Sequence, residues 1–224
     1  MSRSRLLLIL GAAVPALLCA AVGLTHPMDL NPGTALYWQN MHIVLIPLFP
    51  LIALGPWLIA RRVDRRLGWL AAFFGYGFAT LYTALDILAG VGAGAMVLGD
   101  QADATGPIFD IARTLARVGV WSLVIAALVA SVAAVMRARL AALPGAVLAI
   151  AGAYLVYQGH VYFPIGTLAM LLFAAGMAIL AVAVSRVPKA SAPSGGAAGP
   201  SNAANPSNAA NPSNAANPSS AAST

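Results

Sequence analysis

Six long apolar stretches separated by short polar connections constrain this chain of 224 residues more than any other feature. An α-helix rises about 1.5 Å per residue, so about 20 apolar residues cross the hydrocarbon core of a bilayer. Because lipid offers no partner to backbone polar groups, each stretch is expected to be helical. The sequence therefore predicts an all-α integral membrane protein, a bundle of six transmembrane helices with short loops. The expected spans are residues 6–24, 41–60, 67–90, 108–136, 140–157 and 164–185.

The composition agrees with a membrane location. Hydrophobic residues make up 60% of the chain and charged residues 8%, and the mean hydropathy is +0.84. Soluble domains carry about 25% charged residues, so this chain has too few to cover a surface that faces water. These values exclude an ordinary soluble enzyme, a nucleic-acid-binding protein and a chain that is disordered throughout.

The basic residues predict the orientation of the spans. All twelve except Arg113 and Arg117 lie before the first span, after the sixth, or in the connections that follow spans two and four. The positive-inside rule makes that side cytoplasmic, and an even number of spans then places both the N- and C-termini in the cytoplasm. We expect a multi-pass protein of a bacterial plasma (inner) membrane.

The first span has a second interpretation. A basic start followed by an apolar run also describes a secretory signal peptide, with Ala21-Val22-Gly23 as a cleavage site. The run is longer than the usual apolar core of a signal peptide, so we expect it to remain as a transmembrane helix.

The chain is expected to divide into a transmembrane domain, residues 1–187, and a disordered low-complexity tail, residues 188–224. The tail contains three copies of Asn-Ala-Ala-Asn-Pro-Ser, at residues 202–207, 208–213 and 214–219. It has no large apolar residues whose burial would offset the loss of chain entropy. We expect a passive cytoplasmic tail, with a spacer or partner-binding role as the alternative.

Local signals refine the first half of the chain. Asn31-Pro32-Gly33 predicts a turn, and Asn40 is a candidate N-cap for the second span. Trp38 is expected at the level of the lipid headgroups. Prolines within the second span (Pro47, Pro50 and Pro56) predict a bent helix, because each removes a backbone donor.

Polar side chains gather near the outer ends of the spans. Asp86 is an acid within an apolar stretch, and Tyr82 and Thr83 share its helical face. Arg117 immediately precedes the continuous apolar run of the fourth span, at about the same depth. We therefore expect an Asp86–Arg117 ion pair, with Arg117 reaching the lipid headgroups as the alternative. The candidate pocket residues at this end are His42, Tyr82, Thr83, Asp86, Arg113, Arg117, Gln158 and His160.

The three histidines, His26, His42 and His160, are also expected at the outer end. Imidazoles together with a carboxylate bind zinc, copper or iron, so all three are candidate metal ligands, and His42 with His160 is the natural pair for a haem. Their spacing matches no known metal motif. We therefore expect ordinary hydrogen-bonded histidines, with a bound metal or haem as alternatives.

Several other kinds of site are excluded by absent signatures. The chain has no GxGxxG, GxxxxGK[ST] or GxSxG motif, no glutamate and no lysine within a span. Cys19 is the single cysteine, so no intrachain disulfide forms.

We expect a non-catalytic membrane protein: a packing or accessory subunit, or a protein that binds a lipid or small ligand in a polar pocket at the outer leaflet. Its expected partners are membrane lipid, another membrane protein or a second copy of the chain, and not nucleic acid. The first alternative is a small membrane enzyme with a periplasm-facing metal or redox site of His26, His42, Asp86 and His160. The second is a carrier or ion-conducting protein that uses Asp86 and Arg117.

These functions predict different geometries. An enzyme requires the three histidines and Asp86 to converge within about 5–8 Å. A packing protein predicts dispersed histidines and an Asp86 carboxylate satisfied by Arg117, Tyr82 or Thr83.

Overall fold

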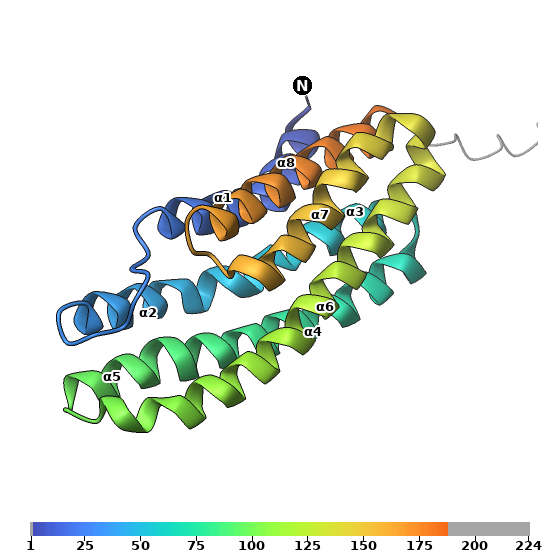
Figure 1. Ribbon diagram of the computed structural model, residues 1–224. Helices are drawn as coiled ribbons and strands as arrows, with labels where there is room; N and C mark the ends of the chain where they lie inside the picture. The colour runs from blue at the N-terminus through green and yellow to red at the C-terminus, as the bar shows by residue number, and fades with distance from the viewer. Residues whose placement is uncertain (1, 188–224) are drawn as a thin grey trace, which may run out of the picture. The chain divides into compact units, whose positions relative to one another are not determined.

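The computed structural model describes residues 2–187, and this part of the chain is helical throughout, with no β-strand (Figure 1). The predicted all-α class is confirmed. The tail expected at residues 188–224 lies outside the described residues.

The helices follow one another with short connections, which include two short 3₁₀ turns and one π-helical segment. In chain order they are α1 (Arg3–Gly23), α2 (Ala35–Ile52), α3 (Leu54–Val63), α4 (Arg65–Leu85), the π-helical η1 (Asp86–Gly92), α5 (Ala93–Leu98), the 3₁₀ turn η2 (Ala102–Ala104), α6 (Thr105–Ala138), the 3₁₀ turn η3 (Arg139–Ala142), α7 (Leu143–Gly159) and α8 (Ile165–Arg186).

Five helical stretches of the described chain are long and apolar enough to cross a membrane. They are Arg3–Gly23, Ala35–Val63, Arg65–Leu98, Ala102–Gly159 and Ile165–Arg186. The fourth contains two helices, α6 and α7, which are joined through η3. Large apolar side chains such as Trp69, Phe73 and Tyr76 are exposed on the outside of these helices, as expected of surfaces that lipid covers.

Local sequence explains where several helices begin and end. Pro56 has no N–H to offer the carbonyl of Ile52, and the helix is interrupted there between α2 and α3. The Asp64 carboxylate then accepts hydrogen bonds from the backbone N–H groups of Arg66 (2.8 Å) and Leu67 (2.9 Å), which caps α4.

The predicted turn at Asn31 is confirmed by a bond from the Gly33 N–H to the Asn31 side-chain oxygen (2.9 Å). The prediction of Asn40 as an N-cap is wrong, because α2 already begins at Ala35, after Thr34. The earlier start places His42 in the second turn of α2, well inside the helix.

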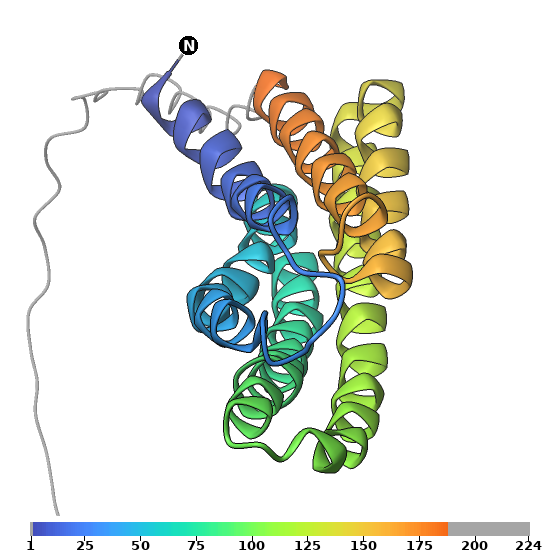
Figure 2. The ribbon, with the colours of Figure 1, turned by 60° about the vertical axis from the view of Figure 1, so that its left-hand side comes forward.

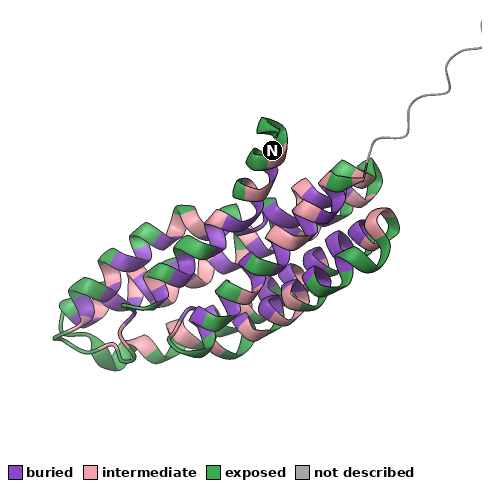
Figure 3. Ribbon diagram, turned by 90° about the horizontal axis from the view of Figure 1, so that it is seen from above, coloured by how far each residue is buried: buried purple, intermediate pink, exposed green. Residues whose placement is uncertain are grey.

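Small residues bring α7 and α8 together. A Cβ atom at Gly152 would lie 2.4 Å from the backbone nitrogen of Phe173, and one at Gly176 would lie 2.3 Å from that of Ala149. Glycine at both positions lets the two backbones touch. The buried residues form stripes along the facing sides of the helices (Figure 3).

The helices differ in length, and this difference positions the site. In Figure 1 the α3–α4 and α6–α7 connections lie toward one end of the bundle, and the α1–α2 and α5–α6 connections lie toward the other. Figure 2 shows α5 and the start of α6 extending well past the ends of α1, α7 and α8. The α1–α2 linker and the α7–α8 turn therefore meet the sides of longer helices.

Candidate metal centre

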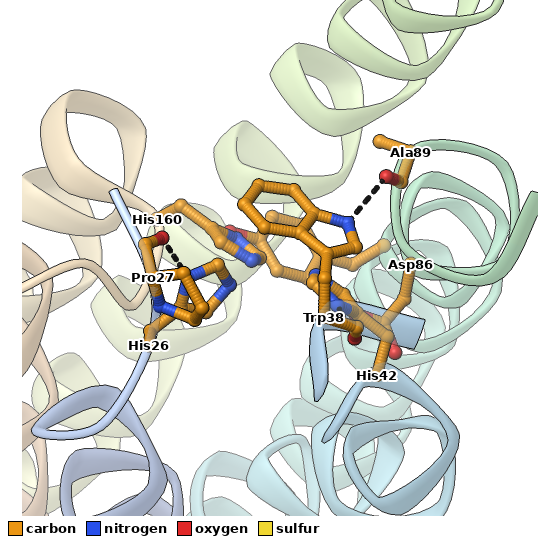
Figure 4. Close-up of polar contacts among 8 residues, drawn as sticks. His26, Pro27, Trp38, His42, Asp86, Ala89 and His160 are labelled. Carbon is orange, nitrogen blue, oxygen red and sulfur yellow. Dashed lines mark hydrogen bonds and ion pairs between the residues drawn. The ribbon is translucent and has the colours of Figure 1, made fainter. Parts of the chain in front are cut away.

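The three histidines converge where the shorter helices end. His26 lies in the α1–α2 linker, His42 in α2 and His160 in the α7–α8 turn (Figure 4). One ligand-capable atom from each residue lies within 4.8 Å of the others. His26 and His42 are buried, and His160 is partly buried. Residues separated in sequence by long helical stretches thus present their imidazoles to one point.

Hydrogen bonds fix the tautomers of two of these rings. Nδ1 of His26 lies 2.7 Å from the carbonyl oxygen of Pro27, and Nδ1 of His42 lies 2.7 Å from that of Trp38. A carbonyl oxygen only accepts, so each Nδ1 must carry the hydrogen and donate it. In the neutral ring, Nε2 then has a free lone pair. Metal-binding histidines commonly use one nitrogen for the metal and donate the other N–H to a fixed oxygen.

The third ring is held by a tyrosine. Nδ1 of His160 lies 2.5 Å from the hydroxyl oxygen of Tyr82, which is buried on α4. The backbone of His160 has a φ of 48°, a conformation that residues with side chains rarely adopt. The backbone of the turn is thus strained at His160, and such backbone strain is common at functional sites.

Aromatic side chains enclose the cluster. The ring centroid of His26 lies 4.9 Å from that of Trp38 and 4.2 Å from that of Tyr162, and the His160 centroid lies 5.6 Å from that of Phe49. Trp38 is only 3% exposed, so its side chain faces the protein interior and not the outer surface of the helices. It packs inward because its indole N–H donates to the carbonyl oxygen of Ala89 (3.0 Å; Figure 4).

Asp86 lies beside the cluster and not in an ion pair with arginine. Its side chain is fully buried, and neither carboxylate oxygen has a hydrogen-bond partner among the described residues. Oδ1 lies 3.9 Å from Nε2 of His42. A buried carboxylate without partners is costly, and a cation shared with the neighbouring imidazole would satisfy it.

The expected Asp86–Arg117 ion pair is wrong. Arg117 is exposed and forms no ion pair or hydrogen bond within residues 2–187. The hydroxyls of Tyr82 and Thr83 do not reach the carboxylate either, since Tyr82 contacts His160 and the Thr83 hydroxyl is without a partner in this part of the chain. The two side chains face different neighbours: Asp86 lies beside His42, and Arg117 lines the cavity next to His160.

The separation of Asp86 from Arg117 predicts how their substitutions combine in their effect on stability in detergent. Because the two side chains do not interact, the effects of Asp86→Asn and Arg117→Gln on the free energy of unfolding should add within about 0.5 kcal/mol in the double variant. Thermal or denaturant unfolding of the four proteins measures this. A coupling free energy of more than about 1 kcal/mol between the two substitutions would instead show that Asp86 and Arg117 interact.

The π-helical segment η1 brings α4 against His42. A Cβ atom on Gly90 would lie 2.2 Å from Cγ of His42, so only glycine allows this approach. π-Helical turns within α-helices are often found at functional sites. Here the segment carries Asp86 at its start, Ala89 as the acceptor for Trp38, and Gly90 against the imidazole.

Burial keeps the loop-borne histidines neutral. It lowers the pKa of His26 from 6.5 to about 4, against the opposing effect of the Pro27 hydrogen bond. Burial also lowers the pKa of His160 well below its usual value, and the neighbouring His42 and His26 lower it further. Neutral imidazoles keep the lone pairs that metal binding requires.

The lowered pKa of His26 predicts a pH-dependent stability of the metal-free protein. Between pH 6.5 and 4 the unfolded state binds the proton and the folded state does not, so this stabilisation is complete above pH 6.5 and is lost as the pH falls toward 4. The shift corresponds to about 3 kcal/mol at most. We expect the melting temperature in detergent with EDTA to fall from pH 7 to pH 5, and to fall less in His26→Gln. An equal fall in both proteins would contradict the buried, neutral His26.

The remaining candidates lie on the other side of His160. Arg113, Arg117 and Gln158 line a cavity of about 330 Å³ together with Tyr82 and His160. Arg113 is paired with Asp110 on the surface. The structure thus separates the candidates into a buried histidine cluster and an arginine-lined cavity that share one wall.

Two participants were not among the predicted site residues: Trp38 and Tyr162. Tyr162 follows His160 by two residues in the same turn, and a local search around each histidine would have found it. Trp38 precedes His42 by four residues, which is the spacing of one helical face. Gly90 and Gly94 form a Gly-x-x-x-Gly spacing that favours close helix approach, but this spacing does not identify His42 as the neighbour.

The geometry does not favour the haem alternative. The rings of His42 and His160 are parallel, with centroids 6.4 Å apart, but His26 lies 5.1 Å from the first and 6.0 Å from the second. The third imidazole therefore occupies the side of the pair where a porphyrin would extend. A single ion suits this arrangement better than a macrocycle.

Comparison of this chain with protein-family models, with curated proteins and with solved structures finds no match. Its function is therefore inferred from the geometry of the histidine cluster and its surroundings.

Proposed function

We propose that this chain is a multi-pass membrane protein that binds one transition-metal ion through His26, His42 and His160. The observation that carries the proposal is the convergence of their ligand-capable atoms within 4.8 Å. In a tetrahedral zinc site, nitrogens at about 2.0–2.1 Å from the metal lie about 3.4 Å from one another. Small ring rotations that move each ligand atom by less than about 1 Å would bring the histidine nitrogens from the observed separation to that of a zinc site.

The donor set favours particular metals. Neutral imidazoles suit zinc, copper, iron and nickel, and a hard ion such as magnesium prefers oxygen. Asp86 adds a carboxylate close to His42, which offsets part of the charge of a divalent ion. We propose zinc or copper as the ion.

Three histidine ligands leave a coordination position open, as in catalytic zinc sites. A bound zinc ion would supply a Lewis acid that activates water or polarises a carbonyl or phosphoryl group. This makes a small membrane enzyme the function that the geometry supports best, ahead of a packing subunit or a carrier.

Metal binding is tested with protein that is purified in detergent from cells grown with added zinc or copper. Elemental analysis should find about one metal ion per chain, and the triple variant His26→Gln, His42→Gln, His160→Gln should hold none while remaining helical by circular dichroism. No stoichiometric metal, together with no saturable zinc binding by the metal-free protein, would overturn the proposal.

We further propose that the membrane holds six spans, with α6 and α7 as separate spans and the arginine-rich connections in the cytoplasm. In a Cys19→Ala background, Arg62→Cys should resist a membrane-impermeant maleimide in intact cells, and Asp103→Cys in the α5–α6 connection should react. The reverse pattern would place the histidine cluster at the cytoplasmic side.

A further inference from the structure

We infer that the arginine-lined cavity beside His160 binds a small organic anion, a carboxylate or phosphate with a short apolar body. The inference deepens the proposed function, because it names the class of molecule presented to the metal centre. The binding of the anion itself does not require the metal.

The cavity is a separate space that adjoins the histidine cluster. It measures about 330 Å³ and lies among α4, α6, the C-terminal end of α7 and the α7–α8 turn. Ligand pockets of proteins begin at about this size. Tyr82, His160 and Tyr162 form the wall that it shares with the histidine cluster, so a molecule inside would contact the ring of a proposed metal ligand.

The cavity carries uncompensated positive charge. Arg113 and Arg117 lie on one face of α6, four residues apart, and both line the cavity. Arg113 is already paired with Asp110, whereas Arg117 has no ion pair in the part of the chain that the structure describes. A guanidinium group binds carboxylate and phosphate through two parallel hydrogen bonds, so a free Arg117 favours an anionic head.

The rest of the lining suits an apolar body. Leu85, Val120 and Val156 supply aliphatic walls, and the Gln158 amide offers one further donor. An anion held at Arg117 would therefore extend its apolar part along these walls toward His160.

The same chemistry describes a free organic acid and the phosphate of a lipid headgroup. We therefore test binding with hexanoate and with inorganic phosphate, using protein in nanodiscs of zwitterionic phosphatidylcholine and in nanodiscs that contain phosphatidylglycerol. A free solute as the natural ligand predicts equal hexanoate affinity in both nanodiscs. An anionic lipid predicts weaker hexanoate binding in the second because the headgroup competes.

The decisive comparison is between two arginine variants. Arg117→Gln should weaken hexanoate binding by about tenfold or more, because it removes the free guanidinium, and Arg139→Gln, at the α6–α7 connection, should leave it unchanged. Isothermal titration in the first nanodisc measures both. Absence of saturable hexanoate and phosphate binding, or equal affinity of wild type and Arg117→Gln, would overturn the inference.

The metal content of Arg117→Gln keeps this test separate from the proposed function. We expect wild-type metal content in this variant, because Arg117 does not contact the histidines. If neither wild type nor Arg117→Gln binds metal, but only wild type binds hexanoate, the anion site is supported and the proposed metal centre is contradicted.

Discussion

Replacing His42 by glutamine is expected to lower zinc affinity by at least about 100-fold. The substitution removes one of three ligands, and this should cost more than loss of an outer hydrogen-bond partner, which is typically about 10–100-fold. His42 is 2% exposed and its Nδ1 donates to the Trp38 carbonyl oxygen, so its imidazole is held in one orientation. Competition with a fluorescent zinc chelator measures the affinity of the protein in detergent.

Two tyrosine variants provide the matched controls. Tyr82→Phe removes the hydroxyl that contacts His160 and should weaken zinc binding by about 10–100-fold, less than the loss of His42. Tyr157→Phe removes a hydroxyl in the adjacent cavity that does not contact a histidine, and should have no effect. Equal zinc affinity in wild type and His42→Gln would remove His42 from the site.

Replacing Gly90 by alanine is expected to destabilise the protein by about 2–4 kcal/mol and to abolish zinc binding. The new methyl group would lie 2.2 Å from Cγ and 2.3 Å from Cδ2 of His42. Either α2 moves away from η1 or the imidazole leaves its place, and both disrupt the histidine cluster. Thermal unfolding and zinc titration in detergent measure the two effects.

Gly106→Ala is the control for this variant. A Cβ atom at Gly106 meets nothing within 4 Å, and alanine favours a helix more than glycine does, so stability should be unchanged or slightly higher. Unaltered stability and zinc affinity in Gly90→Ala would show that α2 and η1 do not approach as closely as described.

The helical class was predictable because it depends on apolar length alone. In lipid, the backbone groups of an apolar stretch of this length have no partner except within a helix, whatever the neighbouring helices do. The prolines of the second span predicted a bent helix, because a missing N–H is a local property, but they did not indicate which proline interrupts it. The start of α2 was not predictable, because the turn at Asn31 allowed the helix to begin at Ala35, before the apolar stretch.

The candidate site was only partly predictable. Depth along the spans placed the histidines at one end of the bundle but said nothing of rotation about each helix axis. Rotation decides that Asp86 faces His42 and that Arg117 faces the cavity. It also decides that Trp38 points inward, because its indole finds a backbone acceptor in η1.

The convergence of the histidines is a property of the tertiary fold. His26 and His160 are brought together by the ends of α1 and α7, which no sequence spacing encodes. The burial that follows lowers the pKa of both residues, so their readiness to bind a metal also arises only in the folded chain.

X-ray absorption at the zinc edge of the stoichiometrically loaded protein tests the metal centre most directly. We expect three imidazole nitrogens at about 2.0–2.1 Å from the ion, with the outer-shell scattering of the rings. A first shell of oxygen with no more than one imidazole would contradict binding through His26, His42 and His160.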